Sequence, residues 1–228
     1  MKNIITVIKK QIRDTFKNKT VLIQFVMFPA LTLIMENAVK FDDMPENFFA
    51  KLFSVMYVGM APLTSAAAII SEEKEKNTLR VLMMANVKPV EYLAGITAYV
   101  WSLCMAGALV ISTCFSSEEL PFYLAVMGAG FVISILIGSC VGIFAKNQMT
   151  STSLVMPVMM VLSFAPMLAM FNDNIKKVAF VFFTQQIRES FGTMSFDAIG
   201  TKGISVICIN AALVFVLFFI TFRKKGLQ

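Results

Sequence analysis

Six long apolar segments, separated by more polar connections, constrain this chain more than any other feature. They lie at residues 21–39, 52–70, 93–115, 122–145, 154–171 and 204–222. Each is long enough to cross a hydrocarbon core of about 30 Å as an α-helix. Because lipid offers no hydrogen bonds to the backbone, such segments must satisfy their own N–H and C=O groups. The sequence therefore predicts an all-α integral membrane protein with six transmembrane helices in a single domain, residues 1–228.

The composition agrees with lipid as the surrounding medium. Of the 228 residues 57% are hydrophobic and only 15% are charged, whereas about 25% are charged in a soluble domain. The net charge of +6 fits the positive-inside bias of membrane proteins, so we expect no nucleic-acid partner. The chain has no histidine, which removes histidine-based triads and metal sites; we expect no catalytic residue and no metal site.

Residues 1–20 have the pattern of a basic amphipathic helix, with a plain solvated helix as the alternative. The apolar side chains at helical spacing are Ile5, Ile8, Ile12 and Phe16. The cations on the other faces are Lys9, Lys10, Arg13 and Lys17. Such a helix is expected to lie in the interface of the anionic inner leaflet.

The distribution of positive charge orients the six spans. With the N-terminus inside, fourteen of the 20 Lys and Arg residues fall in inner segments and six in outer connections. This bias predicts a multi-pass protein of the cell (plasma or inner) membrane with both termini in the cytoplasm. It also predicts that residues 71–92 form a cytoplasmic loop. Residues 172–203 would form an extracellular connection that folds back into the interface as one or two short, re-entrant helices.

The run Ser71–Gly95 is the longest stretch rich in charge, and an apolar segment lies on each side of it. Within it Leu79, Leu82 and Met83 share one helical face. A short helix with an apolar face that lies in the cytoplasm is suited to bind in a groove of a soluble partner. The alternative is a simple solvated connection.

The borders of this short helix can also be predicted. Asn77 or Thr78 is suited to its N-cap, and Pro89 is suited to the first turn of the next span. The expected order is span, short cytoplasmic helix, tight turn, span.

This run resembles the signature of ABC-2 type transporter permeases, E-x-E-[KR]-G-T-L-x-x-L-L-x-x-P-V followed by Glu and Gly. The matching positions are Glu73, Glu75, Lys76, Thr78, Leu79, Leu82, Val87, Glu91 and Gly95. The resemblance extends to the N-terminal helix, the six spans, the long connection before the last span and the basic tail. Asn77 stands in place of the usual Gly, and Asn86 in place of a common Pro, which leaves the local turn geometry open.

The resemblance implies the membrane subunit of an ABC exporter. Such permeases pair in the membrane, and a homodimer is favoured here over a heterodimer. Each engages a cytoplasmic ATPase subunit through a coupling helix between spans two and three. The residues that would make this contact are Glu73, Glu75, Thr78, Leu79, Arg80, Leu82 and Met83. The chain has no GxxxxGK[ST] motif, so ATP and Mg²⁺ would bind the partner, and this chain would bind no cofactor and be no enzyme.

The resemblance also implies that spans one, two and five line the translocation route. The proline and methionine content of these spans points the same way. The methionines of span five expected along the route are Met156, Met159, Met160 and Met167, with plain packing as the alternative. An apolar route suits an amphipathic or hydrophobic cargo such as a peptide, a drug or a lipid-like molecule. Gly138 and Gly142 form a GxxxG, expected to serve intrachain helix packing rather than a dimer seam.

Three other functions compete with transport by an ABC permease. A non-transporting sensor or immunity subunit that binds a toxic peptide would have the same spans. An intramembrane protease could use the pair Glu72–Glu73, but such enzymes also need histidines. A channel would need rings of charge or a filter-like backbone, and the spans contain neither.

Overall fold

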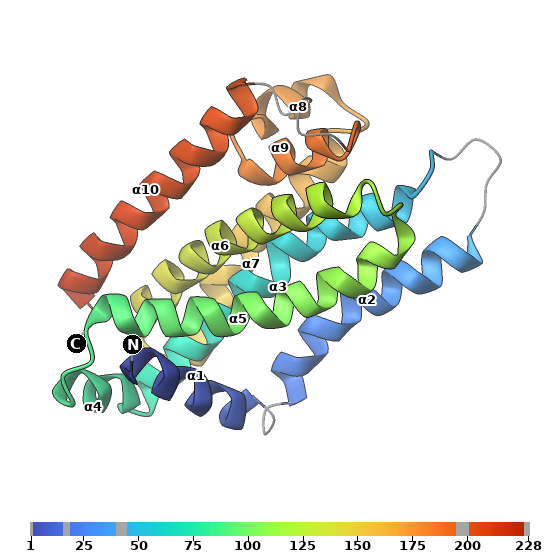
Figure 1. Cartoon of the computed structure of the whole chain (residues 1–228). Helices are drawn as coiled ribbons and strands as arrows, with labels where there is room; N and C mark the ends of the chain where they lie inside the picture. The colour runs from blue at the N-terminus through green and yellow to red at the C-terminus, as the bar shows by residue number, and fades with distance from the viewer. Residues whose placement is uncertain (1, 16–18, 40–44, 195–200, 226–228) are drawn as a thin grey trace.

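The computed structural model describes residues 2–15, 19–39, 45–194 and 201–225, which form a bundle of helices without strands (Figure 1). Phe16 and Lys17, predicted to belong to the N-terminal helix, lie outside the described residues. The helices are α1 (Lys2–Thr15), α2 (Lys19–Ala38), α3 (Phe48–Glu75), α4 (Thr78–Met84), α5 (Pro89–Ile111), the 3₁₀ turn η1 (Ser112–Cys114), α6 (Leu120–Phe144), α7 (Gln148–Leu168), α8 (Asp173–Ala179), α9 (Phe183–Ser190) and α10 (Thr201–Lys225).

Five helices of the described chain are long and apolar enough to cross a membrane. They are α3, α5 with η1, α6, α7 and α10. The chain is therefore a helical membrane protein with several spans. The remaining predicted span corresponds to α2, whose apolar stretch Leu22–Ala38 is shorter than those of the other five; its crossing of the membrane stays a prediction.

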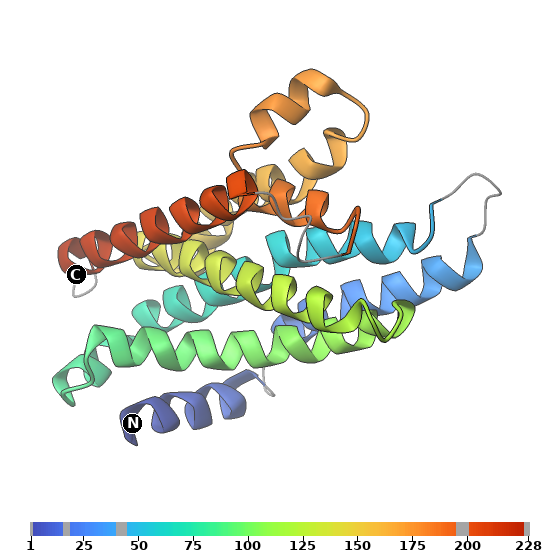
Figure 2. The ribbon, with the colours of Figure 1, turned by 45° about the horizontal axis from the view of Figure 1, so that its top comes forward.

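Helix α3 lies at the centre of the bundle and packs against α2, α5, α6 and α7. Its side chains Tyr57 and Val58 are fully buried. Ser134 of α6 donates a hydrogen bond to the Val58 carbonyl at 2.6 Å, and Ser54 of α3 is 2.8 Å from the Tyr123 hydroxyl. These polar groups inside the bundle thus have partners on the neighbouring helix, as a surrounding without water favours. Helix α10 lies along α6 at the edge of the bundle (Figure 2).

The contact between α3 and α6 depends on glycine. A Cβ atom at Gly138 would lie 2.2 Å from the Leu63 carbonyl oxygen, and one at Gly142 would lie 2.9 Å from that of Ala67. The close approach expected of this GxxxG pair is found within the chain, between α6 and α3.

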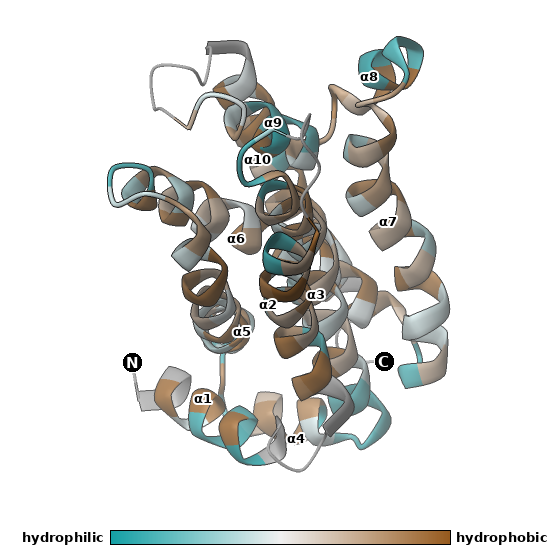
Figure 3. Cartoon of the chain, turned by 90° about the vertical axis from the view of Figure 1, so that its right-hand side faces the viewer, coloured by the Kyte–Doolittle hydropathy of each residue, from teal (hydrophilic) through white to brown (hydrophobic). Residues whose placement is uncertain are grey.

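The two ends of the bundle have different elements. Helices α1 and α4 lie at one end, which we call the α4 end, and α8 and α9 lie at the other (Figure 1). Figure 3 shows hydrophobic residues along the helix bodies and hydrophilic residues near both ends. The short helices α8 and α9 lie between α7 and α10 in the chain, where one or two were predicted.

Several helices extend beyond their predicted limits, most of all at the end of α3 and at the start of α7. Ser71–Glu75 was predicted to belong to a loop, but it forms the end of α3. Here the half-buried Glu72 and the exposed Lys76 form an ion pair at i, i+4 with a distance of 2.5 Å, a spacing that supports a helix. Helix α7 begins at Gln148 rather than residue 154, because the Asn147 side chain accepts a hydrogen bond from the Thr150 N–H at 2.8 Å and caps the helix.

Candidate functional site

The signature run folds into the end of α3, a turn, the short helix α4, a second turn and the start of α5. The predicted order of elements is therefore found. Asn77, with φ 57°, and Asn86, with φ 64°, are both in the left-handed region, which asparagine adopts more readily than most residues. Asn77 occupies the N-cap position of α4 without a side-chain cap bond. Proline could not adopt the conformation of Asn86, because its ring holds φ near −65°.

The apolar face of α4 points into the protein. Leu79 is only 1% exposed, and Leu82 and Met83 are half-buried against the core. These residues were expected to fill a groove on a partner, but in this structure Leu79 is out of reach of any partner. The exposed apolar side chains of α4 are Val81 and Met84, at 57% and 72%, and Arg80 beside them is also exposed. The surface that α4 presents is therefore one helical face away from the predicted one.

Glu73 was also expected on the coupling surface, but it is 5% exposed. The Lys10 ammonium and the Gln11 amide of α1 both donate to its Oε1, the latter at 2.6 Å. The Tyr92 hydroxyl of α5 donates to its Oε2. We call these four residues the Glu73 cluster. A buried carboxylate needs an opposite charge and hydrogen-bond donors, and here both come from other helices, so Glu73 joins α1 and α5 to α3.

Neighbouring residues of α3 extend these connections to α6 and α7. The Lys74 ammonium donates to the Ile143 carbonyl near the end of α6 at 2.7 Å. The exposed Glu75 accepts from the backbone N–H of Gln148, the first residue of α7, at 2.9 Å, where a negative charge is favourable. Thr78 completes the set by donating to the Glu73 carbonyl at 3.1 Å. The last turn of α3 is thus bonded to five other helices.

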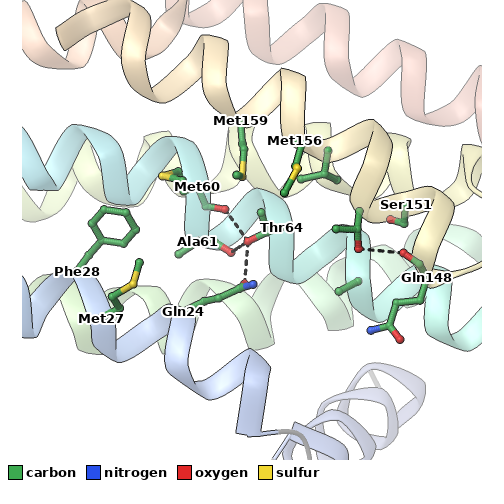
Figure 4. A pocket seen from close by; sticks show the side chains of 13 residues that line it. Gln24, Met27, Phe28, Met60, Ala61, Thr64, Gln148, Ser151, Met156 and Met159 are labelled. Carbon is green, nitrogen blue, oxygen red and sulfur yellow. Dashed lines mark hydrogen bonds between the residues drawn. The ribbon is translucent and has the colours of Figure 1, made fainter.

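A cavity of about 520 Å³ lies between α2, α3 and α7 (Figure 4). We call it the α2–α7 cavity. These helices correspond to the predicted spans one, two and five. Met156 and Met159 line it, as do Met27 and Met60, whereas Met160 and Met167 are not among its lining residues.

No protein-family model matches this chain, and no curated protein matches it. The described residues contain no group of three or more His, Cys, Asp or Glu side chains that could hold a metal ion. The candidate site therefore consists of the α3–α4–α5 region, the Glu73 cluster and the α2–α7 cavity.

Several residues of this site were not singled out from the sequence. Gln11 lies four residues after Val7 and thus on the same face of α1, but only the structure shows that Val7 is buried. Lys10 was read as one of several cations on the other faces of the interfacial helix, and Tyr92 as the last residue of the cytoplasmic loop 71–92. Gln24 and Thr64, which line the cavity and are hydrogen-bonded at 2.8 Å, gave no sequence signal, because they lie forty residues apart.

Proposed function

We propose that this chain is the permease subunit of an ABC exporter that moves an amphipathic or hydrophobic substrate out across the membrane. A separate cytoplasmic ATPase, which binds ATP and Mg²⁺, supplies the energy. The observation that carries the proposal is the fold of the signature run. It forms a short helix between two apolar helices, and left-handed Asn77 stands where the family signature has Gly.

In this proposal α4 is the coupling helix, and its docking face consists of Arg80, Val81 and Met84. Exposed apolar side chains beside a cation are typical of contact surfaces. Leu79 has the opposite role, because its burial holds α4 onto its own bundle. A displacement of α4 by the ATPase would move the end of α3 directly, because Thr78 of α4 donates a hydrogen bond to the Glu73 carbonyl.

The end of α3 is in turn hydrogen-bonded to four other helices. The Glu73 cluster bonds it to α1 and α5, and Lys74 and Glu75 bond it to α6 and α7. A rigid element bonded to several spans can move them together. We propose that α2 is the sixth span, that both termini are cytoplasmic and that two copies of this chain pair in the membrane.

The proposal is tested by purifying the full chain from its native membranes into lipid nanodiscs and identifying any P-loop ATPase that copurifies. A photo-crosslinker at Met84 should react with that ATPase, whereas one at Ser117, exposed in the turn after η1, should not. ATP hydrolysis by the complex should fall in Met84→Asp and stay unchanged in Ser117→Asp. A chain that binds a peptide but copurifies with no ATPase would instead support a non-transporting immunity subunit.

A further inference from the structure

The α2–α7 cavity is large enough for a drug-sized ligand and opens to the surface of the bundle. Its volume of about 520 Å³ lies within the usual range of ligand pockets, about 300–1,000 Å³. Met27 of α2 and Met156 of α7 line it and are 41% and 54% exposed. The mouth of the cavity therefore lies between α2 and α7, on the apolar flank of the bundle.

The lining is polar at one end and apolar at the other. Helices α2 and α7 begin at the α4 end of the bundle, and α3 ends there (Figure 1). The polar lining residues all lie toward that end and are Gln24, Thr64, Gln148, Ser151 and Thr152. The larger apolar ones lie deeper and are Met27, Phe28, Met60, Met156 and Met159. Figure 4 shows this division, with Gln148 and Ser151 at one side and Phe28 and Met27 at the other.

The hydroxyl groups at the polar end are positioned to accept hydrogen bonds. The Thr64 hydroxyl lies 2.8 Å from both the Gln24 Oε1 and the Met60 carbonyl, and its one hydrogen is donated to this pair of acceptors. Thr152 donates to the Gln148 carbonyl at 3.0 Å. Since a hydroxyl has one hydrogen and two lone pairs, these groups have used their hydrogens and keep acceptor capacity. A ligand that donates hydrogen bonds fits this end.

Charge further restricts the ligand. Among the described residues, every side chain that lines the cavity is uncharged. An anionic head group in this position would lose its hydration without gaining an opposite charge, which is costly in an apolar environment. A neutral head that carries hydroxyl or amide donors has no such cost.

We propose that the α2–α7 cavity binds a neutral amphiphile, with a hydroxyl- or amide-bearing head at the α4 end and an apolar body among the methionines. Methionine side chains are flexible and polarisable, so they adapt to bodies of different shape. The inference rests on the proposed function in one respect, that this ligand is the transported substrate. Binding itself requires neither ATP nor the ATPase.

The test uses the purified full chain in lipid nanodiscs without ATPase or ATP. The probe is a monoacylglycerol with a photoactivatable diazirine in its acyl chain, and the matched control probe is the lysophosphatidic acid with the same chain. We expect saturable labelling of peptides that hold Met60 and Met156, and an affinity at least about tenfold lower for the phosphate-headed probe.

Two variants locate the binding site. Thr64→Val keeps the shape of the side chain and removes the hydroxyl, so the monoacylglycerol should bind about three- to tenfold more weakly. Ala68→Leu narrows the polar end of the cavity and should also weaken binding. Thr113→Val is the control, because Thr113 is an exposed hydroxyl on η1, outside the cavity, and its binding should not change.

Equal labelling by both probes, or labelling that never saturates, would mean that the cavity merely accepts acyl chains, and the proposal would fall. It would also fall if Thr64→Val and Ala68→Leu bound the monoacylglycerol as tightly as the unchanged chain. Because the assay contains no ATPase, such a failure would not affect the proposed coupling to an ATPase, which the crosslinking test at Met84 examines. A failure of the crosslinking test would likewise not affect the binding result.

Discussion

Lys10 of α1 forms an ion pair with the buried carboxylate of Glu73, sixty-three residues later near the end of α3. The lysine side chain is 29% exposed and the glutamate side chain 7%. The pair therefore fastens an N-terminal helix with exposed Ile5 and Ile12 to the segment that leads into α4. If α1 lies in the membrane interface, this bond connects the interface to the proposed coupling helix.

Glu73→Gln should destabilise the protein and loosen α1. The change removes the negative charge and leaves Lys10 facing a neutral amide. We expect the free energy of unfolding to fall by about 1–3 kcal/mol. This loss is smaller than for a fully buried pair, because Lys10 is partly exposed. Thermal unfolding in detergent measures the loss, and tryptic cleavage after the exposed Lys9 and Arg13 measures the release of α1. Glu72→Gln is the control, since its exposed pair with Lys76 contributes about 0.3–0.5 kcal/mol. Equal effects of the two changes would mean that the Glu73 cluster does not hold α1.

Truncation of Leu79 should destabilise the protein, whereas truncation of Met84 should not. Leu79→Ala removes a side chain that is 1% exposed and should cost about 2–5 kcal/mol of unfolding free energy. Met84→Ala, at a site 72% exposed, should stay within about 0.5 kcal/mol. Thermal unfolding of the two purified variants checks this difference. A stable Leu79→Ala variant would show that α4 packs on the bundle less closely than the structure indicates.

Gly138→Ala should disrupt the contact of α6 with α3. The added Cβ would lie 2.2 Å from the Leu63 carbonyl oxygen, and backbone cannot move aside as a side chain can, so we expect a loss of about 1–3 kcal/mol. Gly128→Ala is a matched change on the same helix, where the nearest atom, in Trp101, is 3.4 Å away. That variant should be neutral or gain up to about 1 kcal/mol. The prediction fails if the unfolding temperatures of the two variants shift alike.

The turn at Asn77 should accept glycine and reject branched residues. Its φ of 57° costs an ordinary L-residue about 1–2 kcal/mol. Asn77→Gly should therefore leave the unfolding temperature nearly unchanged, whereas Asn77→Val should lower it.

The same comparison applies to Asn86, where Asn86→Gly should be tolerated and Asn86→Pro should not, because proline cannot reach a φ of 64°. A stable Asn86→Pro variant would mean that this turn adopts another geometry.

The elements of the fold were largely readable because each follows from local pattern. Runs of apolar residues mark helices that must satisfy their own backbone in lipid, and Pro89 marks the first turn of α5. The helix boundaries were less accurate, since charged residues such as Glu72 and Lys76 can extend a helix as readily as they can form a loop. The exposed side of α4 differs from the predicted one, because Leu79 is buried whereas Val81 and Met84 are exposed. An apolar face identifies a surface that is buried, but not the molecule that buries it.

The sequence alone predicted a helical membrane protein and the position of the short α4 helix, since both depend on neighbours within a few residues. It left open the turns at Asn77 and Asn86, which the structure shows to be left-handed. Only the tertiary structure decided that Glu73 meets Lys10, Gln11 and Tyr92, and that Gln24 faces Thr64 across a cavity. These contacts join residues that lie far apart in the chain, where no periodicity relates one to the other. They arise from how helices pack around α3, and the free energy of that packing belongs to the whole bundle rather than to any one segment.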